Sequence, residues 1–192
     1  MVTYAGCCLW NFRPVLPARP IDDPENLESL CTFTDTVDEQ WFYLVSVAIE
    51  ARGAPTIPLM IEAMHAARQG DSVTVNECLT IFSNRMQDLQ ELLSRMHERL
   101  SPQAFYFHIR PFLAGSKNMA EAGLPHGVLF EDGTGNEQYR QYSGGSNAQS
   151  SLIQFFDIAL GVEHWPTGVK KNPTAEKLAG AAPPPRHNFI EV

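Results

Sequence analysis

A long run of regularly spaced apolar residues dominates the middle of the sequence. Between Val75 and Leu100 they recur at alternating spacings of four and three, which is typical of one amphipathic helix whose apolar stripe packs along its neighbours. The stripe consists of Val75, Leu79, Phe82, Met86, Leu89, Leu93, Met96 and Leu100. Because such a helix needs helical partners, the sequence predicts a helix from about Ser72 to Leu100 within an all-α helical bundle. The charged residues expected on a solvated face are Asp88, Glu91, Arg95 and Glu98.

Cap residues and prolines mark the starts of three more helices. Thr36 and Glu39 form a capping-box pattern, and the segment that follows, Trp41–Ile49, is apolar on most sides. We therefore expect a central helix there. Thr56–Gln69 is expected to form a second helix, with a proline in its first turn. Ser101–Pro102 ends the long helix and begins another, with serine as the cap and proline at the first helical position.

The two ends of the chain differ in composition from its middle. Residues 1–35 are rich in proline and are predicted to be irregular, and the Asp22–Asp23 pair within them is interpreted as a solvated turn. Residues 36–164 form the predicted helical core, in which Gly127–Glu131 is a short extended piece. Residues 165–192 are rich in proline, glycine and alanine and form a tail. The length of the chain suits a single domain.

Charge and cysteine spacing exclude several classes of function. A net charge of -8 at pH 7 argues against broad electrostatic attraction to nucleic acid or to an anionic membrane. No run reaches the roughly 18 apolar residues of a membrane-spanning helix, so we expect neither partner. No CxxC pair occurs among the four cysteines, Cys7, Cys8, Cys31 and Cys78. We interpret them as reduced, partly buried thiols, which predicts a cytoplasmic protein.

A glycine-rich loop precedes an apolar segment near the end of the core. Gly144 and Gly145 lead into Ser146, which is predicted to cap a helix that ends at Gly161. The free N–H groups at such a helix start, and its partial positive charge, suit a carboxylate or a phosphate. Many helices begin this way without a ligand, so a purely structural role stays open. The loop does not match the GxSxG turn of serine hydrolases, because Ala148 takes the place of the last glycine.

Three runs of residues resemble the signatures of the indoleamine 2,3-dioxygenase family. They are WFYLVS at Trp41–Ser46, FYFHIRPFLAGSKN at Phe105–Asn118 and GGSNAQSSLIQFFDIALG at Gly144–Gly161. The resemblance extends from about Val2 to Phe189, and the run GVEHWPTG resembles fungal members. It implies that residues 1–192 are a single partial domain, which corresponds to the central part of the family's large haem-binding domain.

The resemblance also implies an activity and a site. The family opens the indole ring of L-tryptophan oxidatively to N-formylkynurenine, with haem b as cofactor and with dioxygen and tryptophan, or an indole derivative, as small-molecule partners. Arg110 aligns with the arginine that binds the substrate carboxylate, and Ser46 aligns with a residue on the distal side of the haem; these two are the implied catalytic residues. The other implied substrate-binding residues are Phe42, Tyr43, Phe105, Tyr106, Ser146 and Asn147. The residues implied at the cofactor are Ser46, Gly145, Ser146 and Asn147.

Two of these residues also have an interpretation that needs no ligand. The Ser46 hydroxyl could bind a carbonyl one turn back in its own helix. Arg110 could pair with a structural acid such as Asp157, because an unpaired guanidinium within an apolar segment is costly. The residues alone leave both alternatives open.

The iron ligand is the part of the family's site that this chain is not expected to contain. In the family a proximal histidine on a later helix binds the haem iron, and that helix is expected to lie beyond Val192. His164 and His187 are the candidates for a substitute metal ligand. The alternative to a dioxygenase is therefore a truncated, non-catalytic homologue or a haem-free small-molecule binder or enzyme. Apolar helix faces without partners, such as Val75–Leu100, predict self-association.

Overall fold

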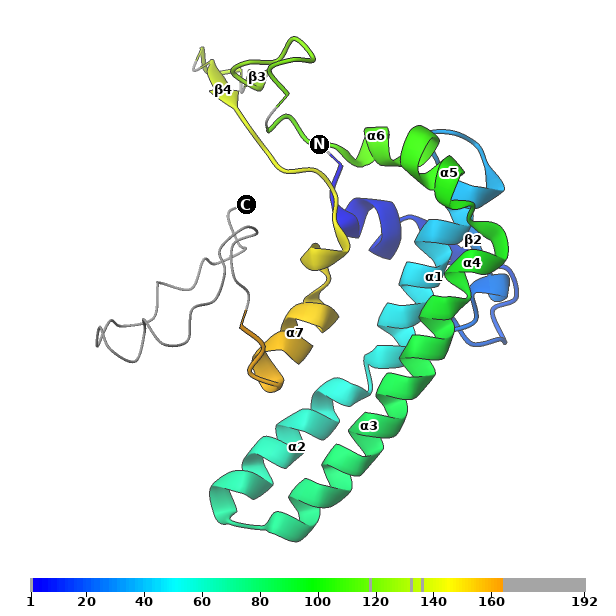
Figure 1. Ribbon diagram of the computed structural model, residues 1–192, viewed down its shortest axis with the longest axis vertical. Coiled ribbons are helices and arrows are strands. Elements are labelled where there is room, and N and C mark those ends of the chain that lie inside the picture. The colour runs from blue at the N-terminus through cyan, green and yellow to red at the C-terminus, as the bar shows by residue number, and fades with distance from the viewer. Residues whose placement is uncertain (1, 118, 132, 136, 164–192) are drawn as a thin grey trace, which may run out of the picture.

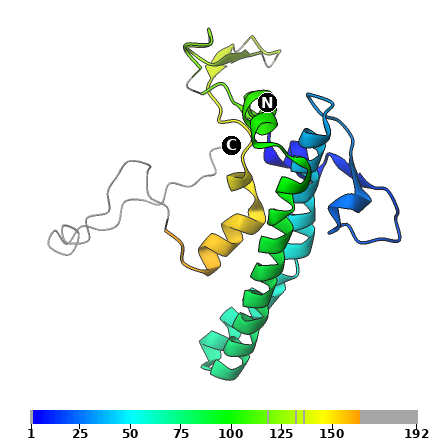
Figure 2. The ribbon, with the colours of Figure 1, turned by 45° about the vertical axis from the view of Figure 1, so that its right-hand side comes forward.

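Three long helices form the frame of the fold. The computed structural model describes residues 2–117, 119–131, 133–135 and 137–163. The long helices are α1 (Val37–Gly53), α2 (Thr56–Gln69) and α3 (Ser72–Ser94). α2 continues from the end of α1, and α3 returns beside both of them (Figure 1). A further helix, α7 (Ser151–Ala159), lies on the side of α1 opposite to the early strands (Figure 2). The predicted all-α helical bundle is confirmed.

Short elements complete the fold. Two antiparallel strand pairs occur in the described part of the chain, β1 with β2 and β3 with β4, and the second pair contains the predicted extended piece. The strands are β1 (Phe12–Pro14), β2 (Leu27–Ser29), β3 (Val128–Phe130) and β4 (Gln138–Arg140). The short helices are η1 (Ala5–Leu9), η2 (Pro24–Asn26), α4 (Met96–Arg99), α5 (Pro102–Ala104), η3 (Phe105–Ile109), α6 (Arg110–Leu113) and η4 (Asn147–Gln149). α5, η3 and α6 follow one another without a gap and make one helical segment.

α1 lies at the centre of the fold, as its apolar sequence predicts. Val45 and Ala48 have no exposed surface. Two separate buried clusters each contain residues of α1. Thr36 caps the helix by accepting a hydrogen bond from the Glu39 N–H at 3.3 Å. The capping box is only half formed, however, because the Glu39 carboxylate is buried and accepts hydrogen bonds from the N–H groups of Phe33 and Thr34 instead.

The buried stripe of α3 differs from the predicted one. Leu79 and Leu93 are 42% and 52% exposed, whereas Cys78 and Leu92 are buried. A straight α-helix has about 3.6 residues per turn, so a stripe with a 3.5-residue repeat drifts around it. The partner of α3 also changes from α2 to α1 along its length (Figure 1). The long helix ends at Ser94, and α4 follows as a separate turn.

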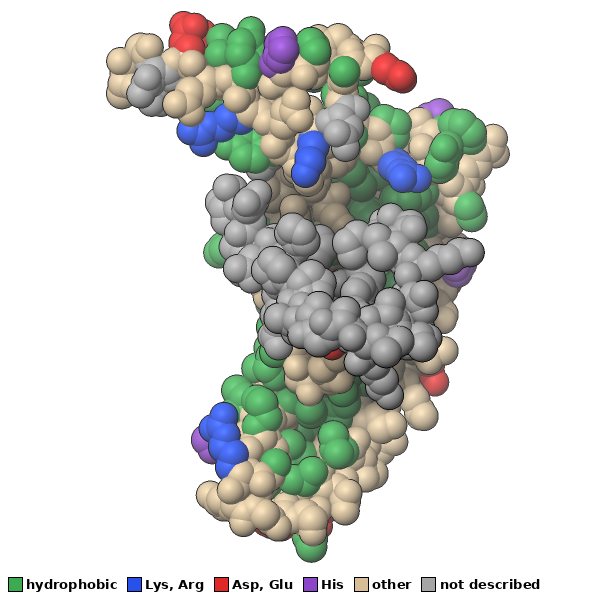
Figure 3. Space-filling view, turned by 60° about the vertical axis from the view of Figure 1, so that its left-hand side comes forward, with side chains coloured by type: hydrophobic (Ala, Val, Ile, Leu, Met, Phe, Trp, Pro, Cys, Tyr) green, Lys and Arg blue, Asp and Glu red, His purple; other side chains and the backbone are tan. Residues whose placement is uncertain are grey.

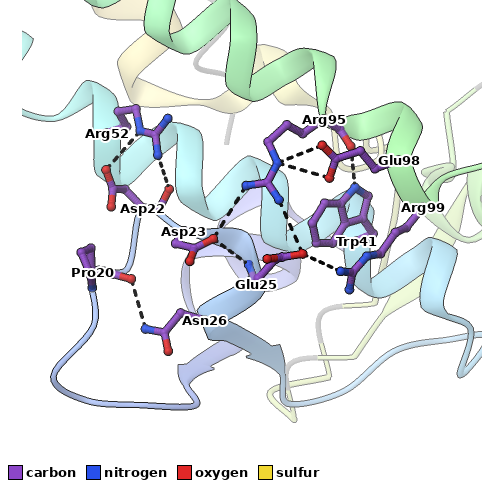
Figure 4. A network of polar contacts seen from close by, with 10 residues as sticks. All are labelled: Pro20, Asp22, Asp23, Glu25, Asn26, Trp41, Arg52, Arg95, Glu98 and Arg99. Carbon is purple, nitrogen blue, oxygen red and sulfur yellow. Dashed lines mark hydrogen bonds and ion pairs between the residues drawn. The ribbon is translucent and has the colours of Figure 1, made fainter.

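Residues 2–35 contain more regular structure than predicted, and ion pairs fasten them to the helices (Figure 4). The Asp22–Asp23 pair is not a solvated turn. Asp22 accepts a hydrogen bond from Arg52 Nε at 3.1 Å, and Asp23 lies 3.7 Å from the Arg95 guanidinium. Arg95 also pairs with Glu98 at 3.1 Å, so these two residues belong to the network and not to a purely solvated face. The partners of these charged residues lie on other elements of the fold, so the local sequence around each residue does not reveal the ion pair.

The predicted last helix begins later than expected. Ser146 caps only the single turn η4, by accepting a hydrogen bond from the Ala148 N–H at 3.2 Å. Ser150 caps α7 and accepts from the Ile153 N–H at 3.1 Å. Gly161, in the left-handed conformation with φ 66°, ends the helix as predicted.

One helical run among the described residues, Val37–Gln69, is by length and composition long and apolar enough to cross a membrane, and an 18-residue window within it has a mean hydropathy of 1.3. Polar residues interrupt this segment, so it contains no unbroken apolar run of the length expected of a membrane-spanning helix. A mean hydropathy tolerates such interruptions, so the segment passes this second criterion. The buried central helix of a folded bundle meets the same criterion, and much of α1 is buried in this fold. The absence of a membrane partner stays a prediction.

Candidate functional site

A cavity of about 590 Å³ lies where four segments that are distant in the sequence meet. They are the N-terminal residues around η1, α1, the segment from η3 to the residues after α6, and the loop before η4. Seven of the residues implied by the family resemblance line it: Phe42, Tyr43, Phe105, Arg110, Gly145, Ser146 and Asn147. The tertiary structure thus brings together residues that are up to about a hundred positions apart.

Two implied residues do not line this cavity. Ser46 is buried behind its wall, and its hydroxyl donates to the Phe42 carbonyl oxygen at 3.0 Å, one turn back in α1. Tyr106 is exposed, and its ring lies 5.4 Å from the Arg110 guanidinium carbon. The candidate metal ligands His164 and His187 lie outside the described residues.

Aromatic rings form one wall of the cavity. The Phe42 and Phe105 rings are tilted at 48° with their centroids 5.0 Å apart, and Tyr43 lies 5.7 Å from Phe42. The Tyr43 hydroxyl donates to the buried Glu39 carboxylate at 2.9 Å, which fixes the ring in place. Tilted rings at these separations are a favourable packing for aromatic side chains, so the wall presents a rigid apolar surface to a ligand.

Two cations lie at the cavity, and no Asp or Glu is among the described residues that line it. Arg110 forms no ion pair with a described residue, and no pair joins it to Asp157. The second cation is Lys117, which the site implied by the resemblance does not include. Its position inside the run Phe105–Asn118 is the sequence signal that could have identified it. The cavity therefore suits an anionic ligand.

Glycines allow two backbone segments to touch beside the cavity. A β-carbon on Gly144 would overlap the carbonyl oxygen of Leu113 and lie 2.6 Å from the Gly115 nitrogen. A β-carbon on Gly115 would in turn overlap the carbonyl oxygen of Tyr142. Gly145, by contrast, has ordinary space, since its nearest neighbour would be a Val2 methyl at 3.5 Å. Close packing at Gly144 therefore sets the position of the loop that carries Ser146.

Glu50 fastens the same loop to α1. Its carboxylate accepts a hydrogen bond from the Tyr4 hydroxyl at 2.8 Å and a short one from the Ser150 hydroxyl. The Gln149 side chain accepts from the Tyr4 N–H at 2.9 Å and donates to the Gly144 carbonyl oxygen at 3.3 Å. These contacts tie the N-terminal segment, α1 and the start of α7 together behind the cavity.

We expect Glu50→Ala to destabilise the protein by about 2 kcal/mol and to loosen the loop, because two buried hydroxyl groups lose their acceptor. Hydrogen exchange should become faster at the amides of residues 145–147, and urea unfolding measures the loss of stability. Glu62→Ala, at an exposed position of α2, is the matched control and should change stability by less than about 0.5 kcal/mol. Unchanged exchange at residues 145–147 would contradict the assignment.

Two thiols also line the cavity, and both are protonated at neutral pH. Burial raises the pKa of Cys8 to about 12, and burial also raises the pKa of Cys7. As predicted, all four cysteines are unpaired. The described lining of the cavity contains no histidine either.

Comparison with known proteins identifies the family. The family model described as indoleamine 2,3-dioxygenase matches residues 1–192. The chain belongs to the indoleamine 2,3-dioxygenase family. It is 45% identical to the indoleamine 2,3-dioxygenase acdA of Aspergillus candidus over 174 residues, which are 88% of the chain and 43% of that relative. It is 41% identical to the Penicillium citrinum enzyme qulI over 99% of the chain and 43% of the relative.

The chain is also similar to the yeast member of this family. The Saccharomyces cerevisiae indoleamine 2,3-dioxygenase is 44% identical over 171 residues, which are 85% of the chain and 37% of that relative. The family predicted from the three sequence runs and the fungal type predicted from the run GVEHWPTG are thereby confirmed. The chain spans less than half the length of the curated relatives it matches.

Proposed function

We propose that this chain forms the substrate-binding side of a haem-dependent dioxygenase that opens the indole ring of L-tryptophan to N-formylkynurenine. One observation carries the proposal: residues of four separate segments converge on one cavity with an aromatic wall and two cations. Tryptophan has the matching chemistry, since it combines a flat aromatic ring with a carboxylate. Haem b would supply the binding and activation of dioxygen. A cytoplasmic location is part of this proposal.

The cavity fits one face and the edge of a haem but not a bond to its iron. The rings of Phe42 and Phe105 suit contact with a flat macrocycle, and the positive charge of the cavity suits an anionic cofactor. None of the described lining residues is a histidine, which is the iron ligand that the family uses. These residues would therefore line the side of the haem on which substrate and dioxygen bind.

The described residues can bind and orient the substrate. Arg110 would bind the carboxylate with both arms of its guanidinium, because its charge is not already used by a described acid. Phe42 and Phe105 would hold the indole ring, and Ser146 and Asn147 would bind polar groups of the ligand. Ser46 would act indirectly, through the hydrogen bond that holds the Phe42 backbone in place.

We expect Arg110→Gln to weaken tryptophan binding by about 10- to 100-fold, since a hydrogen bond between charged groups contributes about 1.5–3 kcal/mol. Arg110→Lys should recover only part of the affinity, because an ammonium lacks the planar fork. Isothermal titration calorimetry of the purified chain measures both. Arg85→Gln, on the exposed surface of α3, is the control and should bind like the wild type. Equal affinity of the Arg110→Gln variant would refute the assigned role.

A second candidate is a haem-free binder of indole carboxylates. It is favoured by the chemistry of the lining, in which no described residue is a histidine. A haem titration followed by its visible spectrum separates the two. A saturable Soret shift at one haem per chain supports the dioxygenase, and its loss in His164→Ala or His187→Ala would identify the ligand. Tryptophan binding without saturable haem binding supports the second candidate.

Self-association through exposed apolar helix faces also stays a proposal. Hydrophobic side chains gather over the lower part of the face in Figure 3, where α2 and α3 lie. Exposed apolar residues on these helices include Ile61, Met64, Leu79, Ile81 and Leu93. Large exposed apolar patches favour association.

A further inference from the structure

The charge of the cavity differs from that of the whole protein. The chain has 22 acidic and 14 basic residues, yet the described lining of the cavity has two basic residues, Arg110 and Lys117, and no acidic one. Chance placement on such an acidic protein would favour carboxylates at any surface. A tryptophan molecule carries one carboxylate, and its ammonium group would be repelled by a second cation. Arg110 alone accounts for the carboxylate of tryptophan, so Lys117 needs a different explanation.

The backbone that carries Lys117 is held in place by several contacts. The Lys117 N–H donates to the Tyr142 carbonyl oxygen at 3.0 Å. One residue earlier, the Ser116 hydroxyl donates to the Arg140 carbonyl oxygen at 3.2 Å and accepts from the Tyr142 N–H at 3.1 Å. Gly115 packs directly on the Tyr142 backbone. These contacts fix the backbone position from which the Lys117 side chain extends.

The side chain of Lys117 forms no ion pair with a described residue. Basic side chains elsewhere on the described molecule do, for example Arg52 with Asp22 and Arg99 with Glu25. Lys117 thus lies at a cavity with its charge available to a ligand. An ammonium group pairs well with a carboxylate, as a point charge and not as a fork.

We propose that Lys117 binds a second carboxylate, so that the occupants of this cavity together carry at least two anionic groups. The proposal rests on the proposed function, in which Arg110 binds the first. Two sources share the chemistry: a propionate of a porphyrin, or a second carboxylate on an indole ligand. Both place an acid group at the edge of the cavity formed by the residues after α6.

The test compares the binding, to the full chain, of ligands that carry no carboxylate, one or two. The probes are L-tryptophan, N-(indole-3-acetyl)-L-aspartate, metal-free protoporphyrin IX and its dimethyl ester, with affinity from calorimetry or fluorescence quenching. Lys117→Gln should weaken a two-carboxylate probe by about 5- to 10-fold and leave tryptophan within about twofold. Lys117→Arg should restore the affinity because it keeps the charge. For the wild type, the affinity of a probe with two carboxylates should fall more steeply with rising salt concentration than the affinity of tryptophan does.

The pattern of losses identifies the source of the carboxylate. A loss for protoporphyrin but not for its dimethyl ester assigns Lys117 to a propionate, whereas a loss for the indole diacid assigns it to the ligand; either result supports the proposal. If Lys117→Gln binds both diacids like the wild type while Arg110→Gln still weakens tryptophan, the proposed function stands and the role of Lys117 is overturned. If neither tryptophan nor protoporphyrin binds the wild type, both are overturned. Thermal unfolding checks that Lys117→Gln is folded, and Lys117→Met replaces it if it is not.

Discussion

Replacing Gly144 by alanine is expected to destabilise the protein by about 3 kcal/mol and to abolish tryptophan binding. The added methyl group would overlap the Leu113 carbonyl oxygen, and it meets backbone, which cannot rotate away as a flexible side chain can. An extra methyl group in a closely packed site forces the backbone to shift, and such a shift costs about 1–3 kcal/mol. The displaced loop carries Ser146 and Asn147 away from the cavity that they line. Urea unfolding and calorimetry with tryptophan measure the two effects.

The adjacent glycine provides a matched control for this experiment. Gly145→Ala adds the same methyl group one position later, where the nearest neighbour would be at 3.5 Å, an ordinary contact. We expect its stability to lie within about 1 kcal/mol of the wild type. Equal destabilisation of the two variants would show that the loop tolerates no β-carbon at all, and it would contradict the role of the contact between Gly144 and Leu113.

Glu39→Gln is expected to destabilise the protein by about 2–4 kcal/mol. The Glu39 carboxylate is buried and accepts hydrogen bonds from the Phe33 and Thr34 N–H groups, and also from the Tyr43 hydroxyl. A glutamine amide would turn an N–H group toward some of these donors, which leaves buried donors unsatisfied. Urea unfolding at pH 7 measures the loss. Glu28→Gln, in an exposed ion pair, should change stability by less than about 0.5 kcal/mol.

The pH dependence of the Glu39 contribution follows from the direction of its pKa shift. Burial by itself would raise the pKa of the Glu39 carboxyl, but the hydrogen bonds from Phe33, Thr34 and Tyr43 outweigh burial and lower the pKa. The stabilisation is therefore fully present above the unfolded pKa of about 4.3 and is lost as the pH falls through the lower pKa of the folded state. The stability difference between wild type and Glu39→Gln should shrink between pH 7 and pH 3. A constant difference across that range would contradict an ionised Glu39.

Only part of the cavity could be predicted from the sequence. The three sequence runs name seven residues that do line the cavity, because the family resemblance carries tertiary information that spacing alone does not. The resemblance does not assign roles to Lys117, Glu50 and Gly115, since their roles depend on contacts with segments that lie far along the chain. Ser46 shows the opposite case, in which the simple prediction of a hydrogen bond one turn back is confirmed.

The sequence by itself determined several of the helix boundaries. Caps, prolines and glycines act within one turn, so Thr36, Ser101 and Gly161 mark the boundaries that the structure shows. Only the tertiary structure decided which side of α3 is buried, which acids pair with Arg52 and Arg95, and which residues meet at the cavity. The physical reason is range: capping and backbone conformation are local, whereas burial, ion pairing and cavity formation depend on the partners that the fold brings together.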